Sequence, residues 1–213
     1  MFKAEESPKG SFLQQTKAAR EERAYEKRKE AAVVTLQSSI RSWSARKKFT
    51  NQILNDFDEF FPHEVSSEAS IELKPVLQVF KQVSRLLIVF KKERDQGRIE
   101  KLCKYLSKSL DSESPKFSYV GVALSKEHYI TWISQMKTVL HHCMLGLDDL
   151  RPQRPGDHRS ILLRLHTLVR FFSSGTWAIL KVKGMEKLKA GMQQLCANVM
   201  GHLVNNGFYT VMK

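Results

Sequence analysis

The sequence has 213 residues, a formal net charge of +13 and a hydrophobic fraction of 42%. These values exclude a chain too polar to bury a core and suggest one domain, or one domain with an additional arm. With only six prolines and ten glycines, the composition favours long helices over a many-stranded β-sandwich. No apolar run approaches the roughly 20 residues that cross a bilayer, so no membrane span is expected.

The first part of the chain divides at its charged residues and at one proline. Residues 1–15 are predicted to form a flexible leader, and residues 16–61 a long helix whose first half mixes Lys and Arg with Glu. Pro62 ends this helix because a proline ring cannot continue the backbone hydrogen-bond ladder. Residues 62–70 are expected to be a polar linker.

Residues 71–213 are predicted to form a helical array. Apolar residues recur there at spacings of three and four, which indicates amphipathic helices. Ser125 is a candidate N-cap for one of them. The secondary structure of residues 117–124 is ambiguous, because they could be helical or extended. The predicted helices cover 71–92, 97–110, 125–150, 159–172 and 185–204. No fixed repeat is apparent, so the predicted class is all-α, either an irregular bundle or an α-solenoid-like array.

A new apolar pattern begins at Phe208 and Tyr209, shortly before the last residue, Lys213. An amphipathic segment that has just begun cannot bury its apolar face alone. We therefore expect this sequence to be a fragment or a short isoform of a longer protein.

One stripe of apolar residues suggests a binding helix. Val33, Leu36, Ile40 and Trp43 stand at positions i, i+3, i+7 and i+10, which places them on one side of an α-helix. Such a stripe, flanked by basic residues, can lie in the groove of an acidic helical protein.

The polar residues beside this stripe have the spacing of an IQ motif. Gln37 follows Leu36 directly, Arg41 comes four residues after Gln37, and Arg46 comes five residues later. Ser42 stands where the motif usually has glycine. By resemblance to IQ-motif proteins, calmodulin or a similar EF-hand protein would bind here, with Gln37 inserted into a lobe and the arginines facing its acidic residues.

Other interpretations of the basic stripe remain open. The helix could dock on its own domain, or lie on an anionic membrane through Trp43. A nucleic-acid-binding protein is a further alternative for so basic a chain. However, Glu residues alternate with Lys and Arg over residues 17–30, which weighs against a membrane and a nucleic-acid partner.

The sequence predicts no metal site, cofactor or catalytic residue. Adjacent histidines such as His141 and His142 point about 100° apart on a helix, which does not suit one metal ion. Cys103, Cys143 and Cys196 are widely spaced and odd in number, which does not fit a disulfide framework. We expect them to be small core residues of an intracellular, cytoplasmic protein, with Trp132 and Trp177 as core anchors.

An ordered set of sequence blocks resembles the N-terminal region of the IQ-motif HECT-type ubiquitin ligases, closest to the ubiquitin-protein ligase 3B branch. The blocks are Ala18–Arg23, Ala31–Gln37, Phe57–Phe61, Glu100–Cys103, Thr176–Leu180, Cys196–Leu203 and Asn206–Tyr209. Together they cover nearly the whole chain beyond about residue 12.

The resemblance implies that the parent protein transfers ubiquitin to substrate lysines. In that family the thioester forms on a cysteine of a C-terminal HECT domain, which would lie beyond residue 213. This chain would then supply regulation, a scaffold or contacts to ubiquitin-pathway proteins. The alternative is a non-catalytic helical adaptor or truncated isoform that competes with the full ligase.

Overall fold

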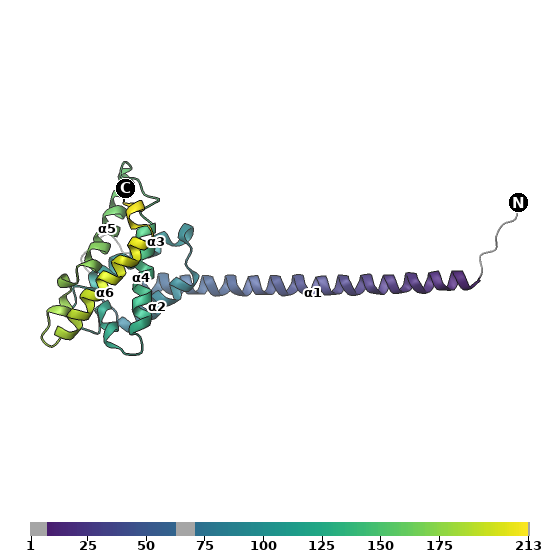
Figure 1. Ribbon diagram of the computed structural model, residues 1–213, viewed down its shortest axis with the longest axis horizontal. Coiled ribbons are helices and arrows are strands. Elements are labelled where there is room, and N and C mark those ends of the chain that lie inside the picture. The colour runs from purple at the N-terminus through teal and green to yellow at the C-terminus, as the bar shows by residue number, and fades with distance from the viewer. Residues whose placement is uncertain (1–7, 63–70, 213) are drawn as a thin grey trace. The chain divides into compact units, whose positions relative to one another are not determined.

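A computed structural model describes residues 8–62 and 71–212 of the chain. The chain divides into two compact units, a helix unit that ends at Gln52 and a bundle unit that begins at Ile53. All of the regular secondary structure in the described residues is helical (Figure 1), which confirms the all-α prediction. Among these residues, no helix is both long and apolar enough to cross a membrane.

Seven α-helices and four 3₁₀ segments make up the described structure. The α-helices are α1 (Pro8–Phe60), α2 (Val76–Val89), α3 (Lys92–Ser109), α4 (Tyr129–Leu145), α5 (His158–Phe172), α6 (Glu186–Asn205) and α7 (Phe208–Val211). The 3₁₀ segments are η1 (Tyr119–Leu124), η2 (Pro155–Asp157), η3 (Ser174–Thr176) and η4 (Ala178–Lys181).

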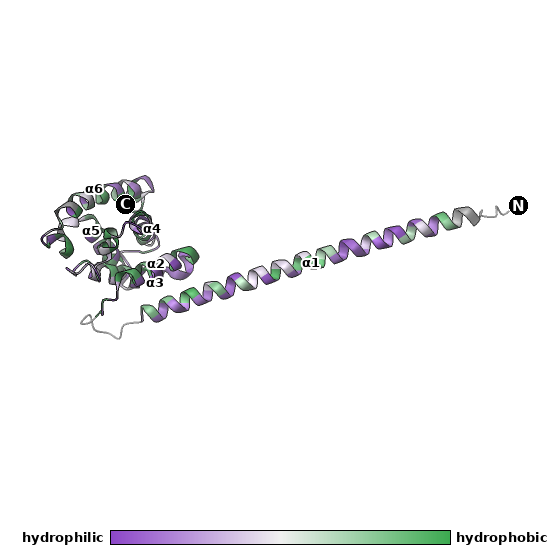
Figure 2. Cartoon of the chain, turned by 90° about the horizontal axis from the view of Figure 1, so that it is seen from below, coloured by the Kyte–Doolittle hydropathy of each residue, from purple (hydrophilic) through white to green (hydrophobic). Residues whose placement is uncertain are grey.

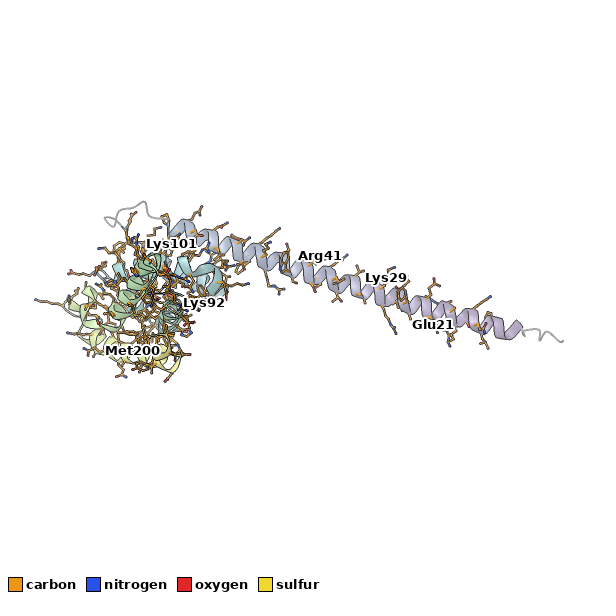
Figure 3. The ribbon with its side chains drawn as sticks, turned by 90° about the horizontal axis from the view of Figure 1, so that it is seen from above. Glu21, Lys29, Arg41, Lys92, Lys101 and Met200 are labelled. Carbon is orange, nitrogen blue, oxygen red and sulfur yellow. The ribbon has the colours of Figure 1, made fainter. Side chains whose placement is uncertain are left out.

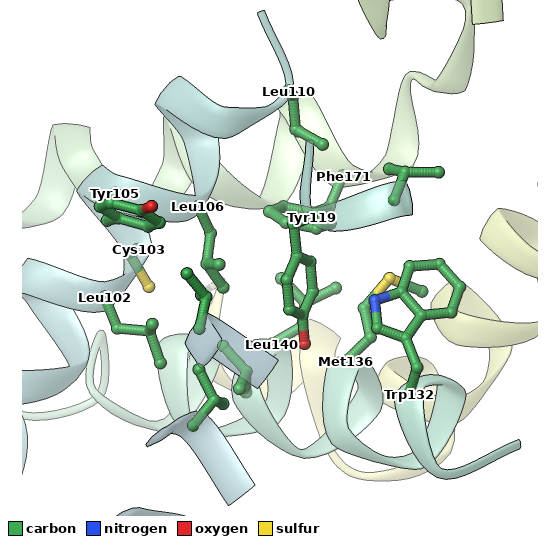
Figure 4. Packing of buried hydrophobic residues seen from close by; sticks show 14 of the residues in the cluster. Leu102, Cys103, Tyr105, Leu106, Leu110, Tyr119, Trp132, Met136, Leu140 and Phe171 are labelled. Atoms are coloured by element: carbon green, nitrogen blue, oxygen red, sulfur yellow. The ribbon is translucent and has the colours of Figure 1, made fainter. Parts of the chain in front are cut away.

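Helix α4 is the centre of the bundle unit, because α2, α3, α5, α6 and η1 all pack against it. Its buried side chains include Trp132, Met136 and Leu140, which meet α3 and η1 in one continuous apolar cluster (Figure 4). Trp132 and Trp177 are both fully buried, as predicted. A single helix surrounded by its neighbours makes this an irregular bundle.

The end of α1 belongs to the bundle core. Ile53, Leu54, Phe57 and Phe61 are all buried, and the Phe61 ring packs edge-on against Tyr105 at a centroid distance of 5.0 Å. The compact unit therefore begins at Ile53, whereas the sequence suggested a division near residue 61. Burial of the last two turns of α1 explains this earlier boundary.

Helix ends differ from the predictions in several places. Helix α1 begins at Pro8, inside the predicted leader, and residues 1–7 lie outside the described part. Most of the predicted 62–70 linker also lies outside it. The prediction of Ser125 as an N-cap is wrong, because α4 begins at Tyr129 and the Ser125 carbonyl instead accepts the Tyr129 amide at 3.0 Å in a preceding turn.

A buried polar chain connects η1, α4 and α2. The Tyr119 hydroxyl donates to the Gln135 carbonyl oxygen at 2.6 Å, and the Gln135 amide donates to the Phe80 carbonyl at 3.0 Å and to the Ser84 hydroxyl at 2.7 Å. Burial raises the pKa of the Tyr119 hydroxyl well above its ordinary value, so it stays a neutral donor. Because buried polar groups without partners are costly, this chain fixes how the three elements meet.

We predict that Gly121→Ala destabilises the bundle. An added Cβ would stand 2.0 Å from the Pro115 carbonyl oxygen, so η1 would have to shift, at a cost of about 1–3 kcal/mol. Urea unfolding followed by tryptophan fluorescence measures the change. The control is Gly201→Ala, an exposed site on α6 with open space around its Cβ, where a gain of up to about 1 kcal/mol is expected. Equal effects would refute the argument.

A second prediction concerns the stability of the bundle at acidic pH. Burial, with a smaller contribution from His141, lowers the pKa of His142 from its ordinary 6.5 to about 4. Between these values the unfolded chain binds more protons at this site than the folded chain does. The free energy of unfolding should therefore fall as pH is lowered from about 6.5 towards 4.

His142→Gln should flatten this pH dependence, measured by urea unfolding at a series of pH values. Part of the slope should remain, because burial and His202 also lower the pKa of His141. The matched control is His166→Gln, at an exposed position on α5, which should keep the full slope. An unchanged slope in His142→Gln would contradict the assignment.

Candidate functional site

The predicted binding residues lie in the helix unit, on the part of α1 that precedes Gln52. The exposed fractions of Leu36, Ile40 and Trp43 are 63%, 64% and 58%, and that of Val33 is 45%. Among the described residues of this unit α1 is the only element, so nothing described in the unit covers these side chains. Large apolar residues exposed in a contiguous row are characteristic of an interaction surface.

The row is narrow and continuous. At 100° per residue, Val33, Leu36, Ile40 and Trp43 fall within an arc of about 80° on the helix. We call this row the apolar stripe. Ser42, which stands where an IQ motif usually has glycine, lies about 120° from Leu36. Its side chain therefore does not project from the stripe.

Polar and basic side chains border the apolar stripe on both sides. Gln37 and Arg41 lie on one side, about 80° and 120° from the middle of the stripe, and Arg46 lies about 100° away on the other. The side chains of the long helix, including Arg41, point outward along its length (Figure 3). A partner that covers the stripe would therefore meet a cation at either edge.

Lys47 lies at the end of the apolar stripe. Its ammonium lies over the Trp43 ring, 5.0 Å from the ring centroid, and it follows Trp43 at i+4 in line with the apolar stripe. Cation–π contacts of this kind contribute about 0.5–1 kcal/mol at exposed sites. The i+4 spacing from Trp43 was the available sequence signal. Lys47 extends the stripe with a positive charge at its end.

The charge of the helix changes along its length. Over residues 31–52 the sequence has four Lys or Arg residues and no Asp or Glu, whereas residues 17–30 mix both signs. Figure 2 shows the corresponding change, with more hydrophilic residues in the earlier part of α1. In the earlier part Lys29 and Glu26 form an ion pair at 3.7 Å. The apolar stripe therefore lies in a purely basic stretch, suited to an acidic partner.

The helix itself is regular through the site. The Thr35 hydroxyl donates to the Ala31 carbonyl at 2.9 Å, and the Ser39 hydroxyl donates to the Thr35 carbonyl at 3.0 Å. These side chains bond back to their own helix rather than to another element. The backbone from Val33 to Phe49 stays helical without a break.

The cysteines are not placed for catalysis. Cys103, Cys143 and Cys196 are free and buried, as predicted. A hydrogen bond with Cys103, together with burial, raises the pKa of the Cys143 thiol, and burial raises that of Cys196. A nucleophilic cysteine needs an accessible thiolate, which this environment opposes.

The described residues also hold no group of three or more His, Cys, Asp or Glu side chains arranged for a metal ion. His141 and His142 lie on α4 with ring centroids 6.0 Å apart. The His142 ring packs on Phe90 at 4.1 Å. Packing, rather than ligation, accounts for the position of His142.

Comparison with known proteins gives one consistent result. The chain is 38% identical over 214 aligned residues to mouse ubiquitin-protein ligase E3B, and 37% identical over the same length to the human protein. Each alignment covers all of this chain and 20% of the relative. No family model and no solved structure matches. This similarity confirms the resemblance to the 3B branch, and the chain spans about a fifth of the length of those relatives.

Mutations in the exposed and in the buried part of α1 should affect the free energy of unfolding to very different extents. Replacing Leu36, Ile40 and Trp43 together by Gln should change the free energy of unfolding of the bundle by no more than about 0.5 kcal/mol, because the side chains are exposed. Phe57→Ala, at a fully buried position, should cost about 3–5 kcal/mol. Urea unfolding followed by the fluorescence of Trp132 and Trp177 reports both. A comparable loss in the triple variant would show that the stripe is packed in solution.

Proposed function

We propose that this chain is a non-catalytic, helical N-terminal segment of a HECT-type ubiquitin ligase, and that α1 binds a calmodulin-type EF-hand protein. The single observation that carries the binding proposal is the apolar stripe. Four large apolar residues are exposed on one side of a helix, in a stretch that has cations and no acids. The parent ligase would supply ubiquitin transfer, through residues outside this chain.

The stripe suits a partner that encloses a helix. Calmodulin-type proteins bind amphipathic helices through apolar anchors spaced at i, i+3 and i+7, as Val33, Leu36 and Ile40 are spaced here. Their acidic surfaces would attract Arg41 and Arg46, which steers association and adds charge-assisted hydrogen bonds. The large apolar area of Trp43 makes it the natural anchor for the second half of the site.

The proposed role of the segment is regulatory. The three cysteines are buried and free, which does not suit them to form a thioester, and the basic helix offers a place where a cellular signal could act on the ligase. An EF-hand partner bound at residues 33–49 would change which surfaces of the parent protein are accessible. We place this activity inside the cell, where ubiquitin transfer and calmodulin occur.

The test is calorimetric titration of calmodulin into the whole chain, with and without calcium. We expect one-to-one binding, and a peptide of residues 28–52 should retain it. Changing Leu36 and Gln37 to Ala should weaken binding at least tenfold, because truncating a central anchor typically costs 1.4 kcal/mol or more. The matched control is Val34→Ala, an exposed apolar residue about 140° from the middle of the stripe, which should stay within about twofold.

Two outcomes would reject the calmodulin-type site. One is the absence of binding in both calcium conditions. The other is an equal affinity of the double variant and the unchanged chain, which would mean that calmodulin binds elsewhere. Neither outcome would affect the proposed relation to a ubiquitin ligase, which rests on the sequence similarity.

A further inference from the structure

The bundle unit has a pocket of about 580 Å³ that the proposed function does not use. It lies between the end of α1, the segment before α2, the middle of α3 and the first turns of α5. Ligand sites in proteins commonly have volumes of about 300–1,000 Å³. The lining side chains used below are Phe61, Tyr105, Lys74, Lys101, Arg159 and Glu100.

The apolar part of the pocket is rigid. Phe61 and Tyr105 are buried and pack edge to face at 5.0 Å. The Tyr105 hydroxyl accepts the Lys74 backbone amide at 2.8 Å, so the ring is held at both ends. Ile71 and Leu163 add to the apolar lining. A preformed surface of this kind needs no rearrangement before an apolar side chain can bind.

Gly97 leaves one wall of the pocket open. It lies inside α3, and nothing stands within 4 Å of the place where its Cβ would be. Its φ is not positive, so neither backbone geometry nor packing requires glycine here. A helix-interior glycine costs about 0.5–1 kcal/mol relative to alanine. Because Gly97 has no side chain, it leaves free space at the wall of the pocket.

The rim of the pocket is positively charged. Lys74, Lys101 and Arg159 contribute cations to it, against two acids, Glu72 and Glu100. The Glu100 carboxylate is already paired with the buried Arg164 guanidinium at 2.9 Å, which reduces its ability to neutralise the rim.

Two of the rim cations illustrate the excess positive charge. Lys101 lies 3.6 Å from Asp58, but Arg98 pairs more closely with the same carboxylate. The Lys74 ammonium lies over the Phe60 ring, 4.2 Å from its centroid, and donates to the Phe60 carbonyl, and neither partner carries a negative charge. A ligand with carboxylates would neutralise the positive charge of this rim.

We infer that this pocket binds a short acidic peptide segment of another protein, with one apolar side chain seated against Phe61 and Tyr105. Gly97 and Lys104 are seven residues apart on α3, or about 10 Å at 1.5 Å per residue. This length matches about three residues of extended chain at about 3.3 Å each. A peptide with an apolar residue between two acids therefore has the length of this part of α3, and its carboxylates would be available to Lys74, Lys101 and Arg159.

The probe is the synthetic peptide acetyl-Asp-Glu-Phe-Glu-Asp-amide, titrated into the whole chain and followed by calorimetry. We expect saturable binding with a dissociation constant below about 1 mM, weakened at least tenfold when the phenylalanine is replaced by glycine. The peptide acetyl-Lys-Lys-Phe-Lys-Lys-amide should not bind. No saturable binding of the acidic peptide, or equal binding of the basic one, would overturn the inference.

Variants of the chain locate the binding. Gly97→Leu fills the pocket and should abolish binding, whereas Gly191→Leu, at a helix glycine with equally open space, should leave it unchanged. Arg159→Glu should weaken binding several-fold, and Arg154→Glu, an exposed residue outside the pocket, should not. If Gly97→Leu binds as well as the unchanged chain, the peptide binds elsewhere and the inference fails. Calmodulin should bind Gly97→Leu as tightly as the unchanged chain, because the proposed calmodulin site lies on α1 and not in the pocket.

Discussion

A buried guanidinium fixes the arrangement of three helices in the bundle unit. Arg164 on α5 is 1% exposed. It donates to the Cys143 carbonyl on α4 at 3.2 Å and to Gln96 and Glu100 on α3, both at 2.9 Å. Removing one partner of such a buried charge typically costs about 3–5 kcal/mol, so these helices cannot slide past one another freely. Gly146 is part of the same constraint, because a Cβ there would stand 2.1 Å from Arg164 Nη1.

The same constraint sets the chemistry of the pocket surface. Glu100 stands between the Arg164 guanidinium and the pocket, so the only acid on the α3 part of the lining is held by a cation from behind. The side of α3 that faces the pocket is therefore basic, although α3 itself contains several acids. Asp95, on the same helix, is fully buried and accepts from Arg94 and Arg98. The negative charge of Asp95 is therefore also neutralised by cations within the bundle.

The sequence was a good guide to where helices form and a poor guide to what each helix touches. Periodicity located all of the longer helices, but only part of the apolar surface of α2 is buried, since Leu77 and Ile88 are exposed. In α5, however, Leu162 and Val169 are exposed while Arg164 is buried. Apolar residues occur nearly all around α5, so spacing alone could not identify its inner face. The pocket was equally inaccessible to sequence reasoning, because its lining comes from Phe60 to Leu163, across several elements.

The two ends of the candidate site's own helix show the same limit. Leu36, Ile40 and Trp43 have spacings of four and three, and Leu54, Phe57 and Phe61 have spacings of three and four. The first set is exposed and the second is buried. An apolar stripe predicts that a helix will be covered, and it does not say by what.

Results

Sequence analysis

The sequence has 213 residues, a formal net charge of +13 and a hydrophobic fraction of 42%. These values exclude a chain too polar to bury a core and suggest one domain, or one domain with an additional arm. With only six prolines and ten glycines, the composition favours long helices over a many-stranded β-sandwich. No apolar run approaches the roughly 20 residues that cross a bilayer, so no membrane span is expected.

The first part of the chain divides at its charged residues and at one proline. Residues 1–15 are predicted to form a flexible leader, and residues 16–61 a long helix whose first half mixes Lys and Arg with Glu. Pro62 ends this helix because a proline ring cannot continue the backbone hydrogen-bond ladder. Residues 62–70 are expected to be a polar linker.

Residues 71–213 are predicted to form a helical array. Apolar residues recur there at spacings of three and four, which indicates amphipathic helices. Ser125 is a candidate N-cap for one of them. The secondary structure of residues 117–124 is ambiguous, because they could be helical or extended. The predicted helices cover 71–92, 97–110, 125–150, 159–172 and 185–204. No fixed repeat is apparent, so the predicted class is all-α, either an irregular bundle or an α-solenoid-like array.

A new apolar pattern begins at Phe208 and Tyr209, shortly before the last residue, Lys213. An amphipathic segment that has just begun cannot bury its apolar face alone. We therefore expect this sequence to be a fragment or a short isoform of a longer protein.

One stripe of apolar residues suggests a binding helix. Val33, Leu36, Ile40 and Trp43 stand at positions i, i+3, i+7 and i+10, which places them on one side of an α-helix. Such a stripe, flanked by basic residues, can lie in the groove of an acidic helical protein.

The polar residues beside this stripe have the spacing of an IQ motif. Gln37 follows Leu36 directly, Arg41 comes four residues after Gln37, and Arg46 comes five residues later. Ser42 stands where the motif usually has glycine. By resemblance to IQ-motif proteins, calmodulin or a similar EF-hand protein would bind here, with Gln37 inserted into a lobe and the arginines facing its acidic residues.

Other interpretations of the basic stripe remain open. The helix could dock on its own domain, or lie on an anionic membrane through Trp43. A nucleic-acid-binding protein is a further alternative for so basic a chain. However, Glu residues alternate with Lys and Arg over residues 17–30, which weighs against a membrane and a nucleic-acid partner.

The sequence predicts no metal site, cofactor or catalytic residue. Adjacent histidines such as His141 and His142 point about 100° apart on a helix, which does not suit one metal ion. Trp132 and Trp177 are expected to be core anchors.

The cysteines suggest a reducing environment. Cys103, Cys143 and Cys196 are widely spaced and odd in number, which does not fit a disulfide framework. We expect them to be small core residues of an intracellular, cytoplasmic protein.

An ordered set of sequence blocks resembles the N-terminal region of the IQ-motif HECT-type ubiquitin ligases, closest to the ubiquitin-protein ligase 3B branch. The blocks are Ala18–Arg23, Ala31–Gln37, Phe57–Phe61, Glu100–Cys103, Thr176–Leu180, Cys196–Leu203 and Asn206–Tyr209. Together they extend over nearly the whole chain beyond about residue 12.

The resemblance implies that the parent protein transfers ubiquitin to substrate lysines. In that family the thioester forms on a cysteine of a C-terminal HECT domain, which would lie beyond residue 213. This chain would then supply regulation, a scaffold or contacts to ubiquitin-pathway proteins. The alternative is a non-catalytic helical adaptor or truncated isoform that competes with the full ligase.

Overall fold

A computed structural model describes residues 8–62 and 71–212 of the chain. The chain divides into two compact units, a helix unit that ends at Gln52 and a bundle unit that begins at Ile53. All of the regular secondary structure in the described residues is helical (Figure 1), which confirms the all-α prediction. Among these residues, no helix is both long and apolar enough to cross a membrane.

Seven α-helices and four 3₁₀ segments make up the described part of the chain. The α-helices are α1 (Pro8–Phe60), α2 (Val76–Val89), α3 (Lys92–Ser109), α4 (Tyr129–Leu145), α5 (His158–Phe172), α6 (Glu186–Asn205) and α7 (Phe208–Val211). The 3₁₀ segments are η1 (Tyr119–Leu124), η2 (Pro155–Asp157), η3 (Ser174–Thr176) and η4 (Ala178–Lys181).

Helix α4 is the centre of the bundle unit, because α2, α3, α5, α6 and η1 all pack against it. Its buried side chains include Trp132, Met136 and Leu140, which join side chains of α3 and η1 in one apolar cluster (Figure 4). Trp132 and Trp177 are both fully buried, as predicted. A single helix surrounded by its neighbours makes this an irregular bundle.

The end of α1 belongs to the bundle core. Ile53, Leu54, Phe57 and Phe61 are all buried, and the Phe61 ring packs edge-on against Tyr105 at a centroid distance of 5.0 Å. The compact unit therefore begins at Ile53, whereas the sequence suggested a division near residue 61. Burial of the last two turns of α1 explains this earlier boundary.

Helix ends differ from the predictions in several places. Helix α1 begins at Pro8, inside the predicted leader, and residues 1–7 lie outside the described part. Most of the predicted 62–70 linker also lies outside it. The prediction of Ser125 as an N-cap is wrong, because α4 begins at Tyr129 and the Ser125 carbonyl instead accepts the Tyr129 amide at 3.0 Å in a preceding turn.

A buried polar chain connects η1, α4 and α2. The Tyr119 hydroxyl donates to the Gln135 side-chain oxygen at 2.6 Å, and the Gln135 amide donates to the Phe80 carbonyl at 3.0 Å and to the Ser84 hydroxyl at 2.7 Å. Burial raises the pKa of the Tyr119 hydroxyl well above its ordinary value, so it stays a neutral donor. Because buried polar groups without partners are costly, this chain fixes how the three elements meet.

We predict that Gly121→Ala destabilises the bundle. An added Cβ would stand 2.0 Å from the Pro115 carbonyl oxygen, so η1 would have to shift, at a cost of about 1–3 kcal/mol. Urea unfolding followed by tryptophan fluorescence measures the change. The control is Gly201→Ala, an exposed site on α6 with open space around its Cβ, where a gain of up to about 1 kcal/mol is expected. Equal effects would refute the argument.

A second prediction concerns the stability of the bundle at acidic pH. Burial, with a smaller contribution from His141, lowers the pKa of His142 from its ordinary 6.5 to about 4. Between these values the unfolded chain binds more protons at this site than the folded chain does. The free energy of unfolding should therefore fall as the pH is lowered from about 6.5 towards 4.

His142→Gln should flatten this pH dependence, measured by urea unfolding at a series of pH values. Part of the slope should remain, because burial and His202 also lower the pKa of His141. The matched control is His166→Gln, at an exposed position on α5, which should keep the full slope. An unchanged slope in His142→Gln would contradict the assignment.

Candidate functional site

The predicted binding residues lie in the helix unit, on the part of α1 that precedes Gln52. The exposed fractions of Leu36, Ile40 and Trp43 are 63%, 64% and 58%, and that of Val33 is 45%. Among the described residues of this unit α1 is the only element, so nothing described in the unit covers these side chains. Large apolar residues exposed in a contiguous row are characteristic of an interaction surface.

The row is narrow and continuous. At 100° per residue, Val33, Leu36, Ile40 and Trp43 fall within an arc of about 80° on the helix. We call this row the apolar stripe. Ser42, which stands where an IQ motif usually has glycine, lies about 120° from Leu36. Its side chain therefore does not project from the stripe.

Polar and basic side chains border the apolar stripe on both sides. Gln37 and Arg41 lie on one side, about 80° and 120° from the middle of the stripe, and Arg46 lies about 100° away on the other. The side chains of the long helix, including Arg41, point outward along its length (Figure 3). A partner that covers the stripe would therefore meet a cation at either edge.

Lys47 lies at the end of the apolar stripe. Its ammonium lies over the Trp43 ring, 5.0 Å from the ring centroid, and it follows Trp43 at i+4 in line with the apolar stripe. Cation–π contacts of this kind contribute about 0.5–1 kcal/mol at exposed sites. The i+4 spacing from Trp43 was the available sequence signal. Lys47 extends the stripe with a positive charge at its end.

The charge of the helix changes along its length. Over residues 31–52 the sequence has four Lys or Arg residues and no Asp or Glu, whereas residues 17–30 mix both signs. Figure 2 shows the corresponding change, with more hydrophilic residues in the earlier part of α1. In that earlier part Lys29 and Glu26 form an ion pair at 3.7 Å. The apolar stripe therefore lies in a purely basic stretch, suited to an acidic partner.

The helix itself is regular through the site. The Thr35 hydroxyl donates to the Ala31 carbonyl at 2.9 Å, and the Ser39 hydroxyl donates to the Thr35 carbonyl at 3.0 Å. These side chains bond back to their own helix rather than to another element. The backbone stays helical without a break through residues 33–49.

The cysteines are not placed for catalysis. Cys103, Cys143 and Cys196 are free and buried, as predicted. A hydrogen bond with Cys103, together with burial, raises the pKa of the Cys143 thiol, and burial raises that of Cys196. A nucleophilic cysteine needs an accessible thiolate, which this environment opposes.

The described residues also hold no group of three or more His, Cys, Asp or Glu side chains arranged for a metal ion. His141 and His142 lie on α4 with ring centroids 6.0 Å apart. The His142 ring packs on Phe90 at 4.1 Å. Packing, rather than ligation, accounts for the position of His142.

Comparison with known proteins gives one consistent result. The chain is 38% identical over 214 aligned residues to mouse ubiquitin-protein ligase E3B, and 37% identical over the same length to the human protein. Each alignment covers all of this chain and 20% of the relative. No family model and no solved structure matches. This similarity confirms the resemblance to the 3B branch, and the chain spans about a fifth of the length of those relatives.

Mutations in the exposed and in the buried part of α1 should affect the free energy of unfolding to very different extents. Replacing Leu36, Ile40 and Trp43 together by Gln should change the free energy of unfolding of the bundle by no more than about 0.5 kcal/mol, because the side chains are exposed. Phe57→Ala, at a fully buried position, should cost about 3–5 kcal/mol. Urea unfolding followed by the fluorescence of the buried tryptophans reports both. A comparable loss in the triple variant would show that the stripe is packed in solution.

Proposed function

We propose that this chain is a non-catalytic, helical N-terminal segment of a HECT-type ubiquitin ligase, and that α1 binds a calmodulin-type EF-hand protein. The single observation that carries the binding proposal is the apolar stripe. Four large apolar residues are exposed on one side of a helix, in a stretch that has cations and no acids. The parent ligase would supply ubiquitin transfer, through residues outside this chain.

The stripe suits a partner that encloses a helix. Calmodulin-type proteins bind amphipathic helices through apolar anchors spaced at i, i+3 and i+7, as the first three stripe residues are spaced here. Their acidic surfaces would attract Arg41 and Arg46, which steers association and adds charge-assisted hydrogen bonds. The large apolar area of Trp43 makes it a suitable anchor for the second half of the site.

The proposed role of the segment is regulatory. The three cysteines are buried and free, which does not suit them to form a thioester, and the basic helix offers a place where a cellular signal could act on the ligase. An EF-hand partner bound at residues 33–49 would change which surfaces of the parent protein are accessible. We place this activity in the cytoplasm, where ubiquitin transfer and calmodulin occur together.

The test is calorimetric titration of calmodulin into the whole chain, with and without calcium. We expect one-to-one binding, and a peptide of residues 28–52 should retain it. Changing Leu36 and Gln37 to Ala should weaken binding at least tenfold, because truncating a central anchor typically costs about 1.4 kcal/mol or more. The matched control is Val34→Ala, an exposed apolar residue about 140° from the middle of the stripe, which should stay within about twofold.

Two outcomes would reject the calmodulin-type site. One is the absence of binding in both calcium conditions. The other is an equal affinity of the double variant and the unchanged chain, which would mean that calmodulin binds elsewhere. Neither outcome would affect the proposed place of the segment in a ubiquitin ligase, which rests on sequence similarity.

A further inference from the structure

The bundle unit has a pocket of about 580 Å³ that the proposed function does not use. It lies between the end of α1, the segment before α2, the middle of α3 and the first turns of α5. Ligand sites in proteins commonly have volumes of about 300–1,000 Å³. The pocket combines an apolar floor with a charged rim.

The apolar part of the pocket is rigid. Phe61 and Tyr105 are buried and pack edge to face at 5.0 Å. The Tyr105 hydroxyl accepts the Lys74 backbone amide at 2.8 Å, so the ring is held at its polar end as well. Ile71 and Leu163 add to the apolar lining. A preformed surface of this kind needs no rearrangement before an apolar side chain can bind.

Gly97 leaves one wall of the pocket open. It lies inside α3, and nothing stands within 4 Å of the place where its Cβ would be. Its φ is not positive, so neither backbone geometry nor packing requires glycine here. A helix-interior glycine costs about 0.5–1 kcal/mol relative to alanine. Because Gly97 has no side chain, it leaves free space at the wall of the pocket.

The rim of the pocket is positively charged. Lys74, Lys101 and Arg159 contribute cations to it, against two acids, Glu72 and Glu100. The Glu100 carboxylate is already paired with the buried Arg164 guanidinium at 2.9 Å, which reduces its ability to neutralise the rim.

Two of the rim cations show how the excess positive charge arises. Lys101 lies 3.6 Å from Asp58, but Arg98 pairs more closely with the same carboxylate. The Lys74 ammonium lies over the Phe60 ring, 4.2 Å from its centroid, and donates to the Phe60 carbonyl. Neither the ring nor the carbonyl carries a negative charge. A ligand with carboxylates would neutralise the positive charge of this rim.

We infer that this pocket binds a short acidic peptide segment of another protein, with one apolar side chain seated against Phe61 and Tyr105. Gly97 and Lys104 are seven residues apart on α3, or about 10 Å at about 1.5 Å per residue. This length matches about three residues of extended chain at about 3.3 Å each. A peptide with an apolar residue between two acids therefore has the length of this part of α3, and its carboxylates would be available to Lys74, Lys101 and Arg159.

The probe is the synthetic peptide acetyl-Asp-Glu-Phe-Glu-Asp-amide, titrated into the whole chain and followed by calorimetry. We expect saturable binding with a dissociation constant below about 1 mM, weakened at least tenfold when the phenylalanine is replaced by glycine. The peptide acetyl-Lys-Lys-Phe-Lys-Lys-amide should not bind. No saturable binding of the acidic peptide, or equal binding of the basic one, would overturn the inference.

Variants of the chain locate the binding. Gly97→Leu fills the pocket and should abolish binding, whereas Gly191→Leu, at a helix glycine with equally open space, should leave it unchanged. Arg159→Glu should weaken binding several-fold, and Arg154→Glu, an exposed residue outside the pocket, should not. If Gly97→Leu binds as well as the unchanged chain, the peptide binds elsewhere and the inference fails. Calmodulin should bind Gly97→Leu as tightly as the unchanged chain, because the proposed calmodulin site lies on α1 and not in the pocket.

Discussion

A buried guanidinium fixes the arrangement of three helices in the bundle unit. Arg164 on α5 is 1% exposed. It donates to the Cys143 carbonyl on α4 at 3.2 Å and to Gln96 and Glu100 on α3, both at 2.9 Å. Removing one partner of such a buried charge typically costs about 3–5 kcal/mol, so these helices cannot slide past one another freely. Gly146 is part of the same constraint, because a Cβ there would stand 2.1 Å from the Nη1 atom of Arg164.

The same constraint sets the chemistry of the pocket surface. Glu100 is the one acid that α3 contributes to the lining, and the Arg164 guanidinium holds it. The side of α3 that faces the pocket is therefore basic, although α3 itself contains other acids. Asp95, on the same helix, is fully buried and accepts from Arg94 and Arg98. The negative charge of Asp95 is therefore also neutralised by cations within the bundle.

Sequence periodicity identified where the helices form and did not identify what each helix touches. It located all of the longer helices, but only part of the apolar surface of α2 is buried, since Leu77 and Ile88 are exposed. In α5, however, Leu162 and Val169 are exposed while Arg164 is buried. Apolar residues occur nearly all around α5, so spacing alone could not select its inner face. The pocket was equally inaccessible to sequence reasoning, because its lining residues come from elements far apart in the chain.

Helix α1 shows how one pattern can serve two purposes. The apolar stripe is exposed, whereas Leu54, Phe57 and Phe61 are buried, although both sets have the spacing of an amphipathic helix. Such a stripe predicts that a helix will be covered and does not say by what, so the sequence left self-docking and an outside partner open. Starting a helix is the unfavourable step and extending it is not. Because burial already holds the end of α1 helical, a partner of the exposed stripe would meet a helix whose ordering cost is reduced, which favours tighter binding.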